Sequence, residues 1–284
     1  MAISVKNIRY TYEPGMPGET VALDGVSFDV PDGMVLGIIG HTGSGKSTLL
    51  QHLNGLIRPD SGEIWIDGTC ITDSKTRMTE IRRRVGLVFQ YPEYQLFEET
   101  VAKDVAFGPK NLGLTEEETD RRVRHAISLV GLDYEEIKAL SPFELSGGMK
   151  RRIAIAGVIA MHPKVLILDE PTAGLDPSAH REILSMIRRI HEDMGIILIF
   201  VSHNMGDIAD ISDRILVMRG GRISLEGTPS EVFSHENELT GMGLDLPPAR
   251  KIVNELAAKT AGFESSALTI EEAAEDIRKY LGKC

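Results

Sequence analysis

Short apolar runs alternate with amphipathic segments over about the first 230 residues of the chain. Three runs, Val35–Ile39, Val165–Leu168 and Ile196–Val201, are almost wholly apolar, which is typical of strands whose two faces are both buried. The remaining strand candidates are Val85–Phe89, Ile215–Met218 and Arg222–Leu225. We therefore expect a largely parallel sheet that helices cover on its faces.

Helices are predicted where apolar residues recur at helical spacing. In Ser178–Met194, four such residues fall on one face, which we interpret as facing the core. The other candidates are Lys46–Asn54, Glu116–Val130 and Gly148–Met161. Because strands and helices alternate, the sequence predicts an α/β core.

Two further segments are predicted to be helical without strands. Residues 114–140 carry Arg121, Arg122 and Arg124 among acidic residues, which we interpret as a solvated helix face. After Thr228-Pro229 the pattern changes, and Pro247-Pro248 begins a helix. Thr269-Ile-Glu-Glu272 then resembles a capping box before a last helix, so we expect a C-terminal helical extension.

Composition narrows the class of protein. The chain has 284 residues, with 42 acidic and 31 basic side chains and a net charge of −11, which argues against broad nucleic-acid binding. Only Cys70 and Cys284 are present, so we expect a small buried thiol and a tail thiol rather than a disulfide framework or a metal cluster. No apolar run approaches the ~20 residues of a membrane span, and no secretory leader is visible. We expect a soluble, intracellular protein made of one large domain with an appendage.

A phosphate-binding loop is the strongest local signal. Gly40-His-Thr-Gly-Ser-Gly-Lys46-Ser47 fits the P-loop pattern between a predicted strand and a predicted helix. Its backbone N–H groups and the helix N-terminus attract phosphates, Lys46 adds a charge for the β- and γ-phosphates, and the Ser47 hydroxyl can bind Mg²⁺. We expect nucleotide contacts from Gly40, His41, Thr42, Gly43, Ser44, Gly45, Lys46, Ser47 and Thr48, with His41 as a spacer and not a catalyst.

The run Val165-Leu-Ile-Leu-Asp169-Glu170 is an apolar strand that ends in two acids. Such charges need a site where cations gather. Beside a P-loop, Asp169 would complete the Mg²⁺ shell and Glu170 would act as the general base for a water that attacks the γ-phosphate. A structural carboxylate is the alternative role for Glu170.

Further motifs resemble those of ATP-binding cassette (ABC) ATPases. Leu145-Ser146-Gly147-Gly148-Met149-Lys150-Arg151-Arg152 is similar to the family's signature motif, with Met149 where glutamine is usual. Gln90 resembles the Q-loop glutamine, Ala173–Asp176 the D-loop, His203 the switch histidine and Tyr12 the aromatic residue that stacks on adenine. The resemblance implies catalytic roles for Glu170, His203, Lys46 and Gln90, a Mg²⁺ shell from Ser47, Gln90 and Asp169, and nucleotide contacts from Tyr12, Ser146, Gly147 and Gly148.

The resemblance covers residues 1 to about 230 and implies a fold and an assembly. The fold would be a RecA-like core with an antiparallel β part and a helical subdomain at about 91–160, followed by the extension at 231–284. Two ATPases would sandwich two ATP molecules, each P-loop facing the other chain's signature turn. A groove near the Q-loop would receive a coupling helix of a membrane partner.

A narrower resemblance rests on Gln90-Tyr-Pro-Glu-Tyr-Gln-Leu-Phe97 and Val105-Ala-Phe-Gly-Pro109. These are similar to ATPases of energy-coupling factor (ECF) transporters of the cobalt type, and the P-loop favours the second ATPase of such a pair. This implies a peripheral protein on the cytoplasmic face of the cell membrane, which powers uptake of a vitamin or metal ion. The partners would be a second ATPase (the same or a different chain), a transmembrane coupling protein and a membrane substrate-binding protein. We expect the aromatic loop at Tyr91, Tyr94, Leu96 and Phe97 to dock a partner.

Two other functions fit the sequence less well. A non-transport ABC ATPase that acts on nucleic acid or the ribosome is disfavoured by the acidic charge, the single P-loop and the lack of long heptads. A binding module with an inactive site is opposed by the presence of Lys46, Asp169, Glu170 and His203 together.

Overall fold

The computed structural model describes residues 3–282, and its strands form two sheets. The six-stranded sheet has the order β10-β9-β3-β8-β7-β6, in which only the β10 edge is antiparallel. The four-stranded sheet is antiparallel, with the order β2-β1-β4-β5. The strands are β1 Ile3–Tyr12, β2 Thr20–Val30, β3 Val35–Ile39, β4 Ser61–Ile66, β5 Thr69–Cys70, β6 Val85–Val88, β7 Val165–Asp169, β8 Ile197–Val201, β9 Arg214–Arg219 and β10 Arg222–Gly227.

The parallel strands are buried on both faces, as their apolar runs predict. Along β7, Leu166 and Leu168 pack into the core on the side of α6 and α7, whereas Val165 and Ile167 pack into a second core that contains β1, β2 and α1. All six predicted strands are present, with ends that differ by at most two residues. The expectation of an α/β fold with a largely parallel sheet is confirmed.

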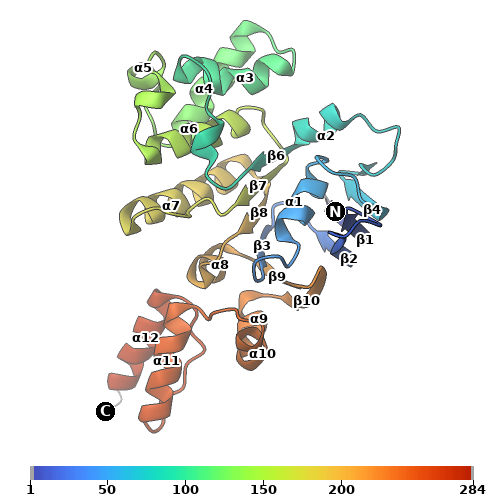
Figure 1. Cartoon of the computed structure of the whole chain (residues 1–284). Coiled ribbons are helices and arrows are strands. Elements are labelled where there is room, and N and C mark those ends of the chain that lie inside the picture. Colours follow the sequence, from blue (N-terminus) through green and yellow to red (C-terminus); the bar gives the residue numbers. More distant parts are fainter. Residues whose placement is uncertain (1–2, 283–284) are drawn as a thin grey trace.

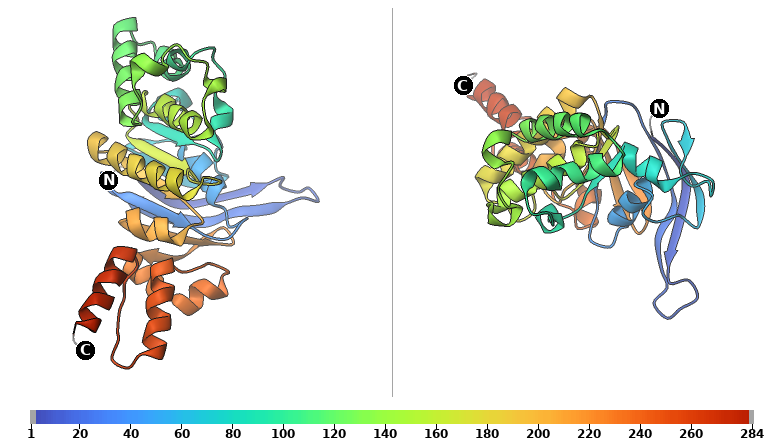
Figure 2. Two further views of the ribbon diagram at one scale, coloured as in Figure 1. Left: turned by 90° about the vertical axis from the view of Figure 1, so that its left-hand side faces the viewer. Right: turned by 90° about the horizontal axis from the view of Figure 1, so that it is seen from above.

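The antiparallel sheet could not be read from hydrophobic pattern alone. In β1 and β4 buried side chains are mixed with exposed ones, because one face of this sheet is partly open to solvent. Only the family resemblance implied this part of the fold. Figure 2 shows β1 and β2 extending sideways from the body of the molecule as a long hairpin.

Helices cover the parallel sheet, and four form a separate lobe. The lobe consists of α3, α4, α5 and α6, at the top of Figure 1. The helices are α1 Lys46–Leu53, α2 Met78–Arg84, α3 Val101–Asn111, α4 Glu116–Leu129, α5 Tyr134–Ile137, α6 Gly147–Ile159, α7 Pro177–Met194, α8 Met205–Ile211, α9 Pro229–Ser234, α10 Glu236–Gly241, α11 Pro248–Lys259 and α12 Ile270–Leu281, with 3₁₀ turns η1 Pro92–Gln95 and η2 Pro142–Glu144.

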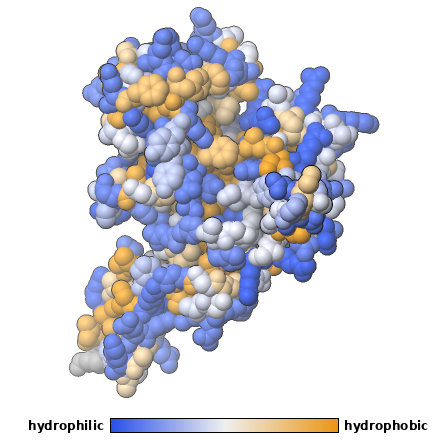
Figure 3. All heavy atoms as spheres, viewed as in Figure 1, coloured by the Kyte–Doolittle hydropathy of each residue, from blue (hydrophilic) through white to orange (hydrophobic). Residues whose placement is uncertain are grey.

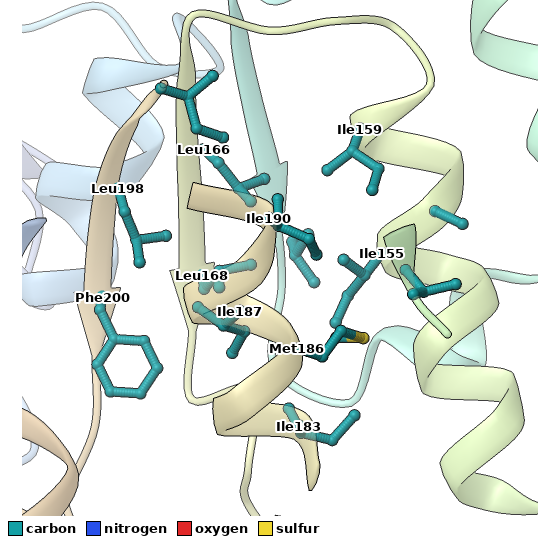
Figure 4. Close-up of a cluster of buried hydrophobic side chains, with 14 of the residues drawn as sticks. Ile155, Ile159, Leu166, Leu168, Ile183, Met186, Ile187, Ile190, Leu198 and Phe200 are labelled. Atoms are coloured by element: carbon teal, nitrogen blue, oxygen red, sulfur yellow. The ribbon is translucent and has the colours of Figure 1, made fainter. Parts of the chain in front are cut away.

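Helix α7 shows how the predicted stripe is used. Ile183, Ile187 and Ile190 are fully buried and point at the sheet and at α6, as Figure 4 shows. Met194 is only half-buried because it lies in the last turn, which Gly195 closes in the left-handed conformation. The predicted insertion at 114–140 contains α4 and α5, but the lobe also includes α3, whose pattern is interrupted by Gly108-Pro109.

The C-terminal extension ends in a helical hairpin of α11 and α12, which has a small core of its own. Thr269 accepts a hydrogen bond from the Glu272 N–H and Glu272 reaches back, so the predicted capping box is present. Val253 and Phe263 are buried between α11 and α12, while Leu281 is exposed. Cys70 is half-buried rather than buried as expected, and Cys284 lies outside the described residues. Within residues 3–282, no helix is both long and apolar enough to cross a bilayer.

Candidate active site

The P-loop lies between β3 and α1, and two of its glycines are required by packing. A Cβ atom on Gly40 would lie 2.4 Å from the Met218 carbonyl oxygen, and one on Gly45 would lie 2.5 Å from that of Ala22. Gly43 has a left-handed φ of +79° but open space around it. The loop is thus held against the core at its two ends and is open in the middle, where an anion can approach its N–H groups.

Lys46 lies across the P-loop. Its Nζ donates to the carbonyl oxygens of Gly40, at 2.6 Å, and His41, at 3.1 Å. Burial lowers the pKa of the Lys46 ammonium, against the opposing effect of the Glu170 and Asp169 carboxylates. His41 itself is exposed, with its ring Nδ1 2.6 Å from the Thr42 carbonyl oxygen.

Ser47 and Asp169 meet although they belong to different elements. Ser47 lies in the first turn of α1 and Asp169 ends β7, and the serine Oγ donates to Asp169 Oδ2 at 3.3 Å. Burial, and then the neighbouring Glu170, raise the pKa of Asp169, whereas the Ser47 hydrogen bond and Lys46 lower it. A hydroxyl and a carboxylate oxygen beside a phosphate loop are the hard ligands that Mg²⁺ prefers, so these residues fit that ion.

Glu170 follows directly and is contacted by two other predicted residues. His203, after β8, places its Nε2 2.8 Å from Oε1, and Gln90, after β6, donates from Nε2 to Oε2 at 3.1 Å. These three residues come from the carboxyl ends of adjacent parallel strands, which meet at one edge of the sheet. Glu170 has a left-handed φ of 50°, a conformation that is uncommon outside glycine.

Tyr12 ends β1 beside the P-loop helix. Its hydroxyl lies 3.3 Å from Thr48 Oγ1, its ring packs edge-on against Tyr10, and 37% of the residue remains exposed. An aromatic face is therefore available next to α1, where a nucleotide base could stack.

The signature turn begins α6 in the helical lobe. Ser146 is the N-cap and accepts from the Met149 N–H at 3.3 Å, and Cβ atoms on Gly147 and Gly148 would meet nothing within 4 Å. Met149 packs partly against the core. No hydrogen bond among the described residues joins this turn to the chain's own P-loop, so the structure brings together all predicted residues except Ser146, Gly147 and Gly148.

Two residues behind this site lie in motifs that the sequence pointed out, but neither of them was assigned a role from the sequence. Arg151 of α6 forms a salt bridge with Glu93 of η1 and also donates to two carbonyl oxygens of the loop after Glu170. No spacing rule connects positions so far apart in the sequence. The only signal was that Arg151 lies in the stretch similar to the signature motif, and arginine side chains are mostly exposed in proteins.

Comparison with known proteins agrees with this geometry. Residues 23–173 match the ABC transporter family. The energy-coupling factor transporter ATP-binding protein EcfA2 of Caldanaerobacter subterraneus subsp. tengcongensis is 55% identical over 281 residues, covering 99% of this chain and 98% of that protein. EcfA2 of Clostridioides difficile strain 630 is 54% identical with the same coverage.

Solved structures show the same relationship. CbiO1 from Clostridium perfringens, described as part of the ABC transporter complex CbiONQ, has a TM-score of 0.75 and 40% identity over 87% of this chain and 96% of that chain. The ATP-binding cassette MJ0796, a dimer bound to ADP and Pi, has a TM-score of 0.70 and 29% identity over 80% and 98% of the two chains. The chain belongs to the ABC transporter family and, within it, to the ATP-binding proteins of energy-coupling factor transporters.

Proposed function

We propose that this chain binds Mg-ATP on its P-loop, hydrolyses it in a dimer of ATPases and so powers uptake through an ECF transporter. The observation that carries this proposal is the arrangement around Glu170, whose two carboxylate oxygens are contacted by His203 and Gln90 beside the Ser47–Asp169 pair. These are the parts that phosphoryl transfer to water requires.

Each residue has a role that follows from its place. Lys46 and the loop N–H groups would hold the phosphates, Ser47, Asp169 and Gln90 would hold Mg²⁺, and Tyr12 would stack on the base. When bound, Mg²⁺ would supply the positive charge that offsets the charge developing on the phosphates. Glu170 accepts the proton of the attacking water, and His203 and Gln90 orient its carboxylate.

The free signature turn supports a dimeric site. Because Ser146, Gly147 and Gly148 lie apart from the chain's own P-loop, one chain holds only half of each ATP site. The second half comes from another ATPase, as the dimeric form of the MJ0796 cassette suggests. We assign residues 1–230 to the ATPase domain, with its helical subdomain at about 91–160, and 231–284 to the extension.

The names of the relatives extend the proposal to the membrane. The EcfA2 proteins are named as transporter ATP-binding proteins, and CbiO1 as part of a transporter complex. We infer a peripheral position on the cytoplasmic face of the membrane, with a second ATPase, a transmembrane coupling protein and a substrate-binding membrane protein that selects a vitamin or metal ion. The alternative of an ATPase acting on nucleic acid or the ribosome is not supported by these relatives.

A groove between the helical lobe and the sheet offers the docking place. Its volume is about 560 Å³, and Phe97 and Phe107 line it, 55% and 45% exposed. Figure 3 shows hydrophobic atoms gathered where the lobe meets the rest of the molecule. In the predicted aromatic patch Tyr91 and Tyr94 are also exposed, whereas Leu96, which lines the groove as well, is only 6% exposed and packs into the core.

The test is copurification in mild detergent from the source cells, with a tag on the full chain. A transmembrane protein should accompany the unmodified chain and a Phe143→Asp control, since Phe143 is an exposed aromatic residue of the lobe that does not line the groove. Phe107→Asp should lose that protein while keeping the second ATPase. Recovery of the unmodified chain with ribosomal or nucleic-acid components and no membrane protein would refute the proposal.

A further inference from the structure

Arg151 is an almost fully buried charge that joins three parts of the molecule. It is 2% exposed and lies on α6, five residues after Ser146. Its Nε and Nη2 donate to the two carboxylate oxygens of Glu93, at 3.1 and 2.8 Å. Its Nη1 donates to the carbonyl oxygens of Pro171, at 3.0 Å, and Ala173, at 2.8 Å. A planar guanidinium can donate two parallel hydrogen bonds to a carboxylate and still donate to carbonyl oxygens from its third nitrogen, which an ammonium group cannot do.

Both segments that Arg151 contacts contain a strained residue next to the active site. Tyr91 has a left-handed φ of 56° immediately before η1, which carries Glu93. Glu170 has a φ of 50° immediately before Pro171. Non-glycine residues keep such conformations only when their surroundings hold them there. Arg151 contacts Glu93, two residues after Tyr91, and Pro171, one residue after Glu170.

One strained residue, Tyr91, directly follows Gln90, and the other is Glu170 itself, the residue that Gln90 must meet. Gln90 precedes Tyr91, and its amide donates to the Glu170 carboxylate at 3.1 Å. The two loops that carry this pair follow the adjacent strands β6 and β7. The guanidinium of Arg151 hydrogen-bonds to both loops, to Glu93 in one and to Pro171 in the other.

The charge state of Glu93 favours a lasting ion pair with Arg151, which we call the Arg151 clamp. Burial raises the pKa of Glu93, but the hydrogen bonds from Arg151, a backbone hydrogen bond and the Arg151 charge together outweigh burial and leave that pKa below its usual value. Glu93 is therefore ionised at neutral pH, and the pair keeps its bidentate geometry where the nucleotide is hydrolysed.

We propose that Arg151, through Glu93 and the carbonyl oxygens of Pro171 and Ala173, is a positioning residue that holds Gln90 and Glu170 in register. The hydrogen bonds of its side chain go to Glu93 and to these carbonyl oxygens, not to Ser47 or Asp169. Because α6 begins at the signature turn, the same residue also fixes the position of that turn relative to the chain's own Glu170. This inference rests on the proposed role of Glu170 as the general base.

The test compares Arg151→Gln with Arg152→Gln in the full chain assembled with its partner ATPase. Arg152 is a matched control because it follows on the same helix, is also largely buried, and bonds to a carboxylate, Glu182, and a carbonyl oxygen, Val130, away from the site. We expect Arg151→Gln to lower kcat by roughly 10- to 100-fold, as displacement of a catalytic group by about 1 Å does, with KM for ATP changed less than about 3-fold. Arg152→Gln should lower Tm without a comparable loss of kcat.

Three further variants separate positioning from stability. Glu93→Gln is nearly isosteric and should reproduce the kcat loss in part, so the proposal stays testable if Arg151→Gln folds poorly. In a Gln90→Ala background, Arg151→Gln should lower kcat much less than it does in the unmodified chain, because the contact between Gln90 and Glu170 is already lost. Arg151→Lys should not restore turnover, since lysine keeps the positive charge but lacks the planar guanidinium that donates to Glu93 and to both carbonyl oxygens at once.

Equal kcat losses in Arg151→Gln and Arg152→Gln, or full additivity with Gln90→Ala, would overturn the positioning role. Glu170→Gln is measured alongside to test the proposed function separately. Undiminished turnover in Glu170→Gln would refute the general base, whereas lost turnover in that variant with normal turnover in Arg151→Gln and Glu93→Gln would refute only the clamp.

Discussion

The imidazole Nε2 of His203 lies 2.8 Å from Oε1 of Glu170. The histidine follows β8 and the glutamate follows β7, so their contact depends on the parallel pairing of these two strands, in which Asp169 is paired with Val201. With Gln90 on the other oxygen, the carboxylate is held from both sides. A group held in this way loses little freedom when it accepts a proton from a water molecule, which is what a general base must do.

Replacing Glu170 with glutamine should separate binding from chemistry. The amide has the same shape but cannot accept the proton, so turnover should fall by about 10²–10⁴-fold. Binding of ATP and Mg²⁺ should persist because Lys46, Ser47 and Asp169 are unchanged. Steady-state ATPase assays and calorimetry measure the two quantities, and near-normal hydrolysis would remove Glu170 from the base role.

Replacing Lys46 with alanine should weaken ATP binding itself. The buried Nζ lies over the P-loop carbonyl groups and supplies a charge to ground-state phosphates as well as to the transition state. Calorimetric titration with ATP should give a higher Kd than for the unmodified chain, while Lys75→Ala, at an exposed lysine, should bind normally. An unchanged Kd for Lys46→Ala would count against the P-loop as the phosphate site.

Replacing Ser146 with arginine tests whether the signature turn works on the partner's nucleotide. The side chain would fill the open turn at Gly147 and Gly148, yet the chain's own P-loop would be untouched. We expect ATP binding to survive, whereas ATP-driven dimer closure and hydrolysis fail.

Sedimentation with and without ATP, in a Glu170→Gln background that traps the closed state, gives the readout. Ser128→Arg is the control, because Ser128 is an exposed serine on another helix of the same lobe. If Ser146→Arg closes with ATP as well as its parent does, the turn does not act across the dimer.

Acid should destabilise the fold through His52. This residue of α1 is 1% exposed, hydrogen-bonds through Nδ1 to the Thr48 carbonyl oxygen, and leaves Nε2 without a partner in the described structure. Burial lowers its pKa below the usual 6.5, so the folded chain binds fewer protons than the unfolded chain once the pH falls below about 6.5. Stability should then decrease as the pH falls from 6.5 toward the folded pKa.

The measurement is Tm between about pH 8 and about pH 5.5, the range in which histidine titrates. His52→Leu should flatten the dependence by up to about 1.4 kcal/mol per pH unit, the limit for one proton. His41→Leu is the control, since His41 is exposed and should keep the slope of the unmodified chain. The same slope in His52→Leu would assign the acid sensitivity to other groups.

Elements whose signal is local were predictable from sequence. The strands of the parallel sheet are read from continuous apolar runs because they are buried on both faces, and the capping box at Thr269 because its two partners are three residues apart. The P-loop pattern likewise contains its strand, its turn and its helix in one segment. In each case the residues that determine the structure are neighbours in the chain.

Tertiary structure alone decided the rest. Contacts between segments far apart in sequence decide which strands are neighbours in the sheet. They also decide that Leu96 is buried while Phe97 beside it is exposed, and that Arg151 pairs with Glu93. The half-exposed strands of the antiparallel sheet gave no clear pattern either, because what they bury depends on their partners. Hydrophobic periodicity reports which face of an element is buried, but not what is packed against it. The fold class and the individual motifs could therefore be derived from the chain itself, whereas the alignment of Gln90 with Glu170 required the packing of four elements against one another.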